Sequence, residues 1–214
     1  MAMKKGDFIE VEYTGIVKEE EMVFDTTDEA KAKELEIHNK NAKYGPIVIC
    51  IGEGHILKGI DKDLEGKEVG EFKIEVGPED GFGKKNAKLL RMIPARTFAK
   101  DNVQPVPGLQ VNMDGVLGII KTVSSGRVIV DFNHPLSGRD LVYEIKVNKI
   151  VDDDNVKIKG LLLLLLNEKD VNFQFEEGKL KVKYEKTIPE EGKEKMIDKI
   201  KELIPAVKEV EFEK

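Results

Sequence analysis

The residues that most often carry enzyme chemistry are few and scattered in this sequence. The three histidines, His38, His55 and His134, are isolated from one another, and Cys50 is the single cysteine. A metal site needs several such ligands at close spacing, and a nucleophilic site needs a base beside the nucleophile, so the sequence favours neither. We therefore expect no metal ion and no cofactor.

Two glycine pairs, Gly52-x-Gly54 and Gly81-x-Gly83, could suggest phosphate-binding loops. Neither pair has the remaining glycines or the following Lys-Ser/Thr of such loops, so we interpret both as turns. Asp25 precedes two threonines, so it could also be a turn former.

Alternation of apolar and polar residues predicts the strands of a first region, and a compact apolar run adds one more. These strands are expected at 8–15, 22–27, 46–52, 71–76 and 141–150. Helical spacing of Ile56, Leu57, Ile60 and Leu64 predicts a short helix that ends near Gly66. Residues 28–40 are polar, and we expect them to form a surface excursion.

The pattern changes between about Asn86 and Asp131, where short strands are predicted at 110–113, 116–123 and 127–132. Asp114-Gly and Ser125-Gly are hairpin signals between these strands. The alternation that stops at Gly83 resumes at Leu141, so the block is predicted to be a small β-rich insert.

A further boundary is predicted at Val151-Asp-Asp-Asp-Asn, after which the sequence restarts. A helix or buried segment at 156–166 precedes a hairpin around Glu177-Gly178, an amphipathic helix from about 190 to 203, and a last strand. We expect a small α+β module here.

The composition excludes some partners. The 35 basic and 41 acidic residues are interleaved, so no positive patch for nucleic acid is expected. The apolar run Leu161–Leu166 is far shorter than the ~20 residues of a membrane span. With one cysteine and no apolar signal core at the start, we expect a cytoplasmic protein without membrane contact.

Five dispersed segments resemble the FKBP-type peptidyl-prolyl cis/trans isomerases. These segments are 11–15, 23–27, 52–61, 77–83 and 133–147. The block at 86–131 stands where that family has its flap loop, and it resembles the insert-in-flap domain of the SlyD-like subgroup. The C-terminal module resembles the extension of long archaeal members.

The resemblance implies an α+β fold, in which a half-wrapped antiparallel sheet surrounds a short helix. It also implies three domains. Residues 1–85 and 132–152 would form the isomerase domain, 86–131 an inserted β-rich chaperone domain, and 153–214 a C-terminal α+β domain.

A pocket for a proline ring is also implied. Its catalytic residues would be Tyr13, Phe24, Asp25, Ile56, Leu57, Ile60, Phe82 and Tyr143, with Ile47, His134 and Leu136 as further substrate contacts. Ile56 is the position whose backbone N–H would hold a substrate carbonyl. Ile60 replaces a tryptophan that the family often has, and Phe82 replaces a tyrosine.

The insert holds more apolar residues than a module of its size buries well, so we expect an exposed groove for unfolded chains. The residues expected to contact substrate there are Met92, Ile93, Phe98, Met113, Val116 and Leu117.

The function expected from these features is isomerisation of X-Pro bonds in unfolded or partly folded polypeptides, joined to chaperone activity. Two alternatives remain at this point. The chain could be a non-catalytic holdase with a decayed pocket, or an assembly adaptor whose C-terminal domain docks on a partner or forms a homodimer.

Overall fold

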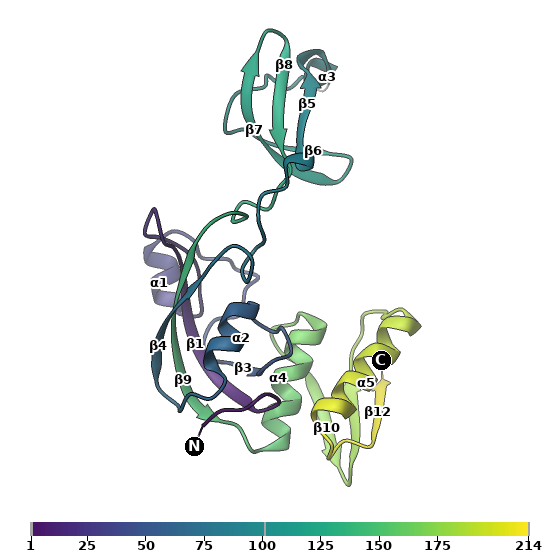
Figure 1. Ribbon diagram of the computed structural model, residues 1–214. Helices are drawn as coiled ribbons and strands as arrows, with labels where there is room; N and C mark the ends of the chain where they lie inside the picture. Colours follow the sequence, from purple (N-terminus) through teal and green to yellow (C-terminus); the bar gives the residue numbers. More distant parts are fainter. Residues whose placement is uncertain (1, 101, 214) are drawn as a thin grey trace.

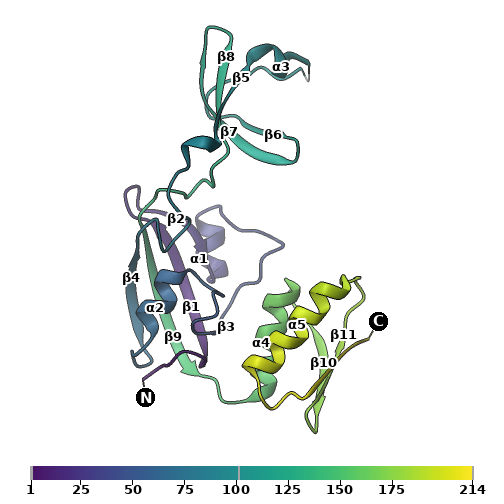
Figure 2. The same ribbon diagram turned by 45° about the vertical axis from the view of Figure 1, so that its right-hand side comes forward.

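The chain folds around three separate sheets. The computed structural model describes residues 2–100 and 102–213, without the side chain of Lys100. A five-stranded sheet wraps around a short helix, and a four-stranded sheet stands away from it on two connecting segments (Figure 1). A three-stranded sheet with two helices lies beside the first (Figure 2). We call these parts the core module (residues 2–85 and 132–152), the insert (86–131) and the C-terminal module (153–213).

The core sheet is antiparallel throughout, with strand order β2-β1-β9-β4, and β3 pairs with β1. Its strands are β1 (Phe8–Val17), β2 (Met22–Thr26), β3 (Ile47–Cys50), β4 (Glu71–Val76) and β9 (Leu141–Ile150). Every strand predicted for this region is present. Strands β1 and β9 are central neighbours although the insert separates them in the sequence.

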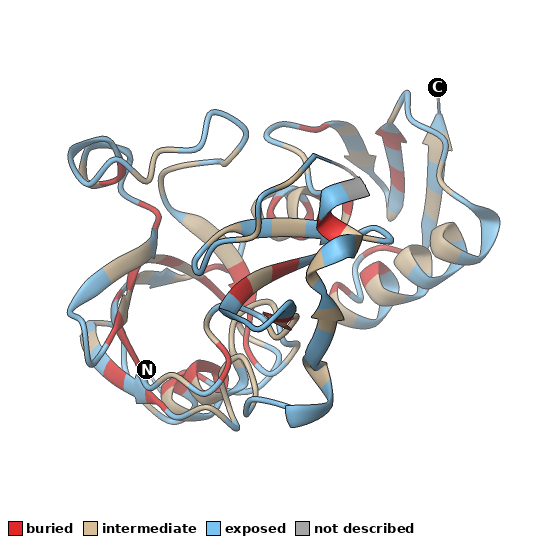
Figure 3. Cartoon of the chain, turned by 90° about the horizontal axis from the view of Figure 1, so that it is seen from above, coloured by how far each residue is buried: buried red, intermediate tan, exposed pale blue. Residues whose placement is uncertain are grey.

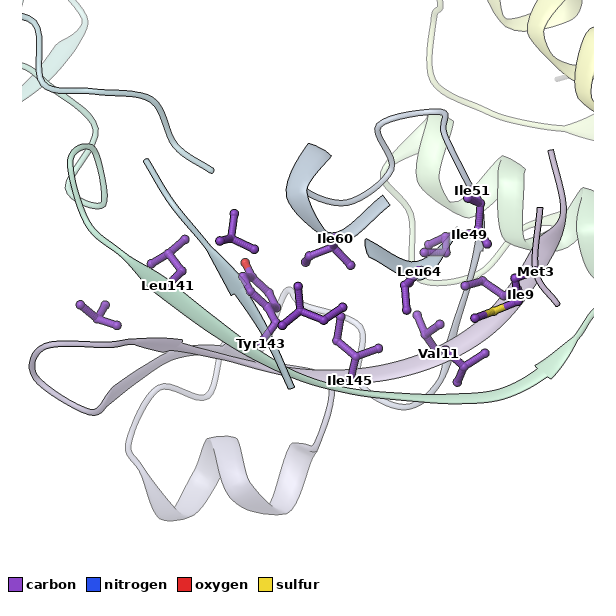
Figure 4. Close-up of a cluster of buried hydrophobic side chains, with 14 residues drawn as sticks. Met3, Ile9, Val11, Ile49, Ile51, Ile60, Leu64, Leu141, Tyr143 and Ile145 are labelled. Atoms are coloured by element: carbon purple, nitrogen blue, oxygen red, sulfur yellow. The ribbon is translucent and has the colours of Figure 1, made fainter. Parts of the chain in front are cut away.

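Two helices flank this sheet. In α1 (Glu29–Glu34), the carboxylate of Asp28 accepts the first free N–H groups and so caps the helix. Helix α2 (Lys58–Leu64) lies in the concave face, where Ile60 and Leu64 point at the sheet (Figure 4).

The helix was expected to include Ile56 and Leu57, and this is wrong, because it begins only at Lys58. Leu57 has an extended backbone, with ψ of 143°, and serves as the N-cap. Gly54, with φ of +69°, ends the preceding turn. Both apolar residues therefore lie on an irregular segment at the mouth of the concave face.

The insert folds from contiguous residues into an antiparallel sheet of order β5-β8-β7-β6. Its elements are the 3₁₀ turn Ala87–Leu89, β5 (Leu90–Pro94), α3 (Ala95–Lys100), β6 (Gln110–Met113), β7 (Val116–Ser124) and β8 (Arg127–Asp131). Both predicted hairpins are confirmed. Asp114-Gly115 and Ser125-Gly126 have positive φ at both residues, as a type I′ turn requires.

The core of the insert is small. It consists of Phe98, Ile120, Val128 and Val130, and many of the other residues of the insert are exposed (Figure 3). Phe98 was expected to contact substrate, and this is wrong, because only 5% of it is exposed. It lies on α3, a helix that the sequence did not predict, and that helix covers the sheet.

The C-terminal module joins two helices to a sheet of order β10-β11-β12. Its elements are α4 (Asp154–Leu166), β10 (Asn172–Glu176), β11 (Lys179–Lys183), α5 (Glu190–Leu203) and β12 (Glu209–Glu213). Strands β10 and β11 form the predicted hairpin, while β12 runs parallel to β11 after the crossover through α5. Asp153 caps α4, and Asn167 ends it in the left-handed conformation.

The C-terminal module and the core sheet share one hydrophobic cluster. Phe8 of β1 and Cys50 of β3 are buried with Ile158 and Leu162 of α4. Gly160 lets α4 approach closely, since a Cβ atom there would lie 2.6 Å from Val48 Cβ. The two modules are therefore packed together rather than tethered.

The apolar face of α5 is used inside the chain. Ile200 and Ile204 are each 1% exposed within the same cluster. This face is therefore unavailable for a contact between two copies, and the homodimer remains a hypothesis that needs another surface. Within residues 2–100 and 102–213, we find no helix with the length and apolar character of a membrane span.

Candidate active site

A cavity of about 300 Å³ opens on the concave face of the core sheet, beside the start of α2. It is lined by Val11, Tyr13, Asp25, Gly54, His55, Ile56, Leu57, Ile60, Tyr143 and Ile145. The structure thus brings together most of the expected catalytic residues from β1, β2, β9 and the segment before α2. Ile60, 1% exposed, forms the apolar floor.

A larger hollow of about 530 Å³ lies on the opposite face of the sheet. Its walls include Glu12, Lys73, Glu144 and Lys146, which alternate with the inward-facing residues of the same strands. These charged walls stay wet, so this hollow offers no dry environment for a substrate.

Aromatic rings form one wall of the smaller cavity. Phe24 meets Tyr143 and Phe82 edge-on, with ring centroids 5.9 and 6.1 Å apart. Tyr13 lies 5.8 Å from Tyr143. Gly15 leaves the space that Phe24 occupies, since a Cβ atom there would come within 2.7 Å of the Phe24 ring. Phe24 thus joins the site through its contact with Tyr143, and Phe82 through its contact with Phe24.

Asp25 brings a charge to the edge of the cavity. The Tyr13 hydroxyl donates a hydrogen bond of 2.9 Å to Asp25 Oδ2. Burial, followed by the charge and hydrogen bond of Asp25, raises the pKa of Tyr13 far above its ordinary value. Burial and the same carboxylate raise the pKa of Tyr143. Both tyrosines therefore remain neutral hydrogen-bond donors at physiological pH.

The segment at 52–57 forms the opposite wall and is held by side chains. Asp61 Oδ2 accepts the Gly54 N–H at 3.1 Å, and His55 Nδ1 accepts the Cys50 N–H at 3.0 Å. Within the described residues, the backbone N–H groups of Ile56 and Leu57 have no acceptor. Both groups are available to a ligand carbonyl.

The rim of the cavity joins the two chain segments that lead to and from the insert. His134 stacks on Phe82 with ring centroids 4.6 Å apart, and Leu136 packs against the core cluster. Ile47 lines a neighbouring cavity of about 320 Å³ that shares Tyr13, Phe24 and Asp25 with the site. The expected contact residues of the core module thus surround the site without lining the main cavity.

The expected contact residues of the insert lie away from this cavity and differ in exposure. Met92, Val116 and Leu117 are exposed by 61%, 53% and 57%, whereas Ile93 and Met113 are partly buried. Three other apolar residues of the insert are also exposed although they were not among the expected contact residues, namely Leu90, Val106 and Val123.

Four cavity residues were also absent from the predicted set: Val11, Gly54, His55 and Ile145. Val11 and Ile145 could have been found from the alternation of their strands, because each occurs two residues from an expected pocket tyrosine. Gly54 and His55 lie inside the glycine-rich motif that contains Ile56.

Comparison with known proteins identifies the family. The family model described as FKBP-type peptidyl-prolyl cis-trans isomerase matches residues 1–103, and the model described as FKBP26, IF domain, matches residues 91–136. The short-type peptidyl-prolyl cis-trans isomerase of Methanocaldococcus jannaschii is 35% identical over 149 residues, which are 69% of this chain and 94% of that protein. The chain belongs to the FKBP-type peptidyl-prolyl cis-trans isomerases.

Other relatives match a smaller part. The FKBP-type peptidyl-prolyl cis-trans isomerase SlyD of Haemophilus influenzae is 33% identical over 111 residues, which are 48% of this chain and 56% of that protein. The N-terminal domain of FKBP42 from Arabidopsis thaliana covers 70% of this chain and 76% of its own at 17% identity, with a TM-score of 0.36.

The family and α+β fold expected from the motifs are thus confirmed. The chain is a peptidyl-prolyl cis-trans isomerase, and its substrates are proline-containing polypeptides. Membership of this enzyme family favours the enzyme over the holdase and adaptor alternatives.

Proposed function

We propose that the 300 Å³ cavity is the proline pocket of this FKBP, because it unites aromatic walls, an apolar floor and two free backbone donors. Its catalytic residues are Tyr13, Phe24, Asp25, Ile56, Leu57, Ile60, Phe82 and Tyr143. Rotation about the X-Pro bond meets a barrier of roughly 18–20 kcal/mol, which arises from C–N resonance.

Apolar walls suffice to lower this barrier. The planar amide separates more charge onto its carbonyl oxygen than the twisted amide does, so water stabilises the planar form more strongly. A dry pocket removes this extra stabilisation of the planar form by water. A pocket that binds the twisted form more tightly than the planar form lowers the barrier to rotation, which is catalysis. The burial of Ile60 and the edge-on packing of Phe24 supply such walls.

The polar groups orient the substrate in this scheme. The N–H of Ile56 or Leu57 donates a hydrogen bond to a substrate carbonyl and so fixes the peptide on one side of the proline ring. Asp25 holds the Tyr13 hydroxyl in place through their 2.9 Å hydrogen bond. With one side of the peptide fixed, the X-Pro bond can rotate while the ring remains in the pocket.

The insert has a second role in this proposal, as a chaperone domain that binds unfolded chains. Leu90, Met92, Val116 and Leu117 remain exposed because the insert core is small. Methionine and leucine side chains adapt to varied apolar partners. A chain held there meets the nearby pocket at raised effective concentration. We assign residues 1–85 and 132–152 to the isomerase domain, 86–131 to the chaperone domain and 153–214 to the C-terminal domain.

The aromatic wall provides the test of the proline pocket. Phe24→Ala is expected to lower kcat/KM on a short proline peptide by about 10- to 100-fold, since the wall loses a fully apolar ring. Phe212→Ala removes the same kind of side chain from the C-terminal module and is expected to retain activity. A protease-coupled assay measures both variants, and near-normal turnover by Phe24→Ala would rule out this pocket.

A further inference from the structure

An ion pair connects the C-terminal module to the wall of the pocket. Lys199 of α5 contacts the carboxylate of Glu53, and its Nζ atom also lies 3.1 Å from Glu202 Oε2. The Glu53 side chain is only 14% exposed and that of Lys199 33%. By contrast, the pair of Lys195 and Glu191 on the same helix is 75% and 80% exposed. Glu53 and Lys199 thus form a shielded contact between two modules.

Glu53 lies in the segment at 52–57, which has little backbone support. Within the described residues, the N–H groups of Glu53, His55, Ile56 and Leu57 have no acceptor. Gly52 and Gly54 adopt positive φ values of 84° and 69°. The conformation of this wall therefore depends on side-chain contacts.

Side-chain contacts hold this wall. Asp61 and His55, both from the core module, hold Gly54 and the end of β3. A further contact, that of Glu53 with Lys199, involves a residue outside the core module. The wall of the pocket is therefore supported partly by a contact from the C-terminal module.

The position of Lys199 is itself well fixed. The next residue, Ile200, is 1% exposed in the cluster that also contains Cys50 of β3. Cys50 lies two residues before the start of the wall segment in the sequence. Because α5 is packed against the base of this segment, the ammonium group of Lys199 is presented to Glu53 from a rigid support.

Loss of Lys199 would leave Glu53 shielded without its cation. A carboxylate deprived of its partner in such a place is strongly unfavourable, and rotation toward water relieves the cost. Because Glu53 belongs to the wall segment, this rotation would also displace the backbone of the wall. The free N–H groups of Ile56 and Leu57 would then shift relative to the aromatic wall across the cavity.

We propose that Lys199 is a positioning residue for the isomerase reaction, acting through Glu53 on the segment that presents Ile56 and Leu57 to the substrate. The inference rests on the proposed proline pocket. It assigns the C-terminal module a part in catalysis.

Lys199→Met tests the inference in the full-length chain. Because displacement of a substrate-orienting group by a fraction of an ångström is costly, we expect kcat/KM on a short proline peptide to fall about tenfold. Lys199→Arg retains the cation and should recover most of this loss. Lys195→Met removes a lysine from the exposed pair on the same helix and should leave kcat/KM unchanged.

A double-mutant cycle separates positioning from a general loss of stability. Glu53→Gln needs no counter-ion, so Lys199→Met should cause no further loss in that background. Amide NMR signals of residues 52–57 should shift in Lys199→Met and return in Lys199→Arg. Additive losses, unaltered activity of Lys199→Met, or an equal loss in Lys195→Met would overturn the inference.

The results for the Lys199 and Phe24 variants distinguish a failure of this inference from a failure of the proposed pocket. If Phe24→Ala retains activity, the proposed pocket is wrong. If Phe24→Ala loses activity while Lys199→Met does not, only the role of Lys199 is wrong. If Lys199→Met unfolds, the cycle is run with Lys199→Gln and Glu53→Gln, where non-additive losses in kcat/KM support coupling and additive losses refute it.

Discussion

The imidazole of His134 lies flat on the ring of Phe82, with centroids 4.6 Å apart and planes 4° apart. Phe82 precedes the insert and His134 follows it, so the stack joins the two connecting segments that lead to and from the insert. Nearby, Ser137 Oγ donates to the Phe82 carbonyl at 3.0 Å, and the Gly138 N–H donates to the Gly83 carbonyl at 2.8 Å. These contacts hold the two connecting segments of the insert together at the rim of the pocket.

Replacement of His134 by alanine should loosen this rim. A stacked pair contributes about 0.5–1.5 kcal/mol, so we expect kcat/KM on a proline peptide to fall about three- to tenfold. His134→Phe restores a flat ring and should restore most of the activity. The protease-coupled assay compares the two variants, and equal activities in alanine and phenylalanine would show that the stack has no catalytic effect.

Surface residues of the insert should determine how well unfolded proteins are handled. In the double variant Met92→Ser and Leu117→Ser, loss of exposed apolar contacts should weaken binding of an unfolded chain about tenfold. The measurement is the ratio of kcat/KM on an unfolded protein to kcat/KM on a short peptide. Asn112→Ser, directly opposite Leu117 across the hairpin, serves as the control. An unchanged ratio in the double variant would refute the chaperone role.

Acid should destabilise the fold through His55. Burial chiefly lowers the pKa of His55 below 6.5, and nearby Lys199 adds to the effect, while Asp61 and Glu53 oppose it. Below pH 6.5 the unfolded chain therefore binds a proton that the folded chain does not, so the free energy of unfolding falls as the pH falls through this window. His55→Asn keeps an acceptor for Cys50 N–H and should remove this part of the dependence.

Urea unfolding of the wild type and His55→Asn at successive pH values measures this difference. Identical pH dependence of the two proteins would mean that His55 does not contribute.

Two helical glycines should respond to alanine with opposite signs. At Gly160 the new Cβ would lie 2.6 Å from Val48 Cβ, and such overpacking costs about 1–3 kcal/mol. At Gly192 the nearest atom is Ile188 Cγ2 at 3.7 Å, so alanine should stabilise by about 0.5–1 kcal/mol. Chemical denaturation measures both variants. A stabilising Gly160→Ala would argue against the close packing of α4 on β3.

Local patterns predicted the strands and hairpins well. Alternation defined β1, β4 and β9, and the dipeptides Asp114-Gly115 and Ser125-Gly126 defined two turns, because both signals depend on adjacent residues. The five motifs identified the family because they occur in the right order. Such signals can be recognised without knowing which elements pack against one another.

Other features depend on contacts between distant segments and could not be predicted. Helix α3 buries Phe98, although nothing in its short sequence distinguishes it from a loop. The start of α2 at Lys58 depends on Gly54 and Asp61 holding the preceding turn. The contact of Glu53 with Lys199 joins charged residues far apart in the sequence. The sequence alone is equally compatible with many other pairings of charged residues.

The position of β9 beside β1 has a consequence for the newly made chain. Residues emerge from the ribosome in order, and the core sheet lacks a central strand until β9 has followed the insert out of the tunnel. All strands of the insert pair with one another and have emerged by Asp131. During synthesis, each molecule thus completes the surface proposed to bind unfolded chains before it completes its own isomerase domain.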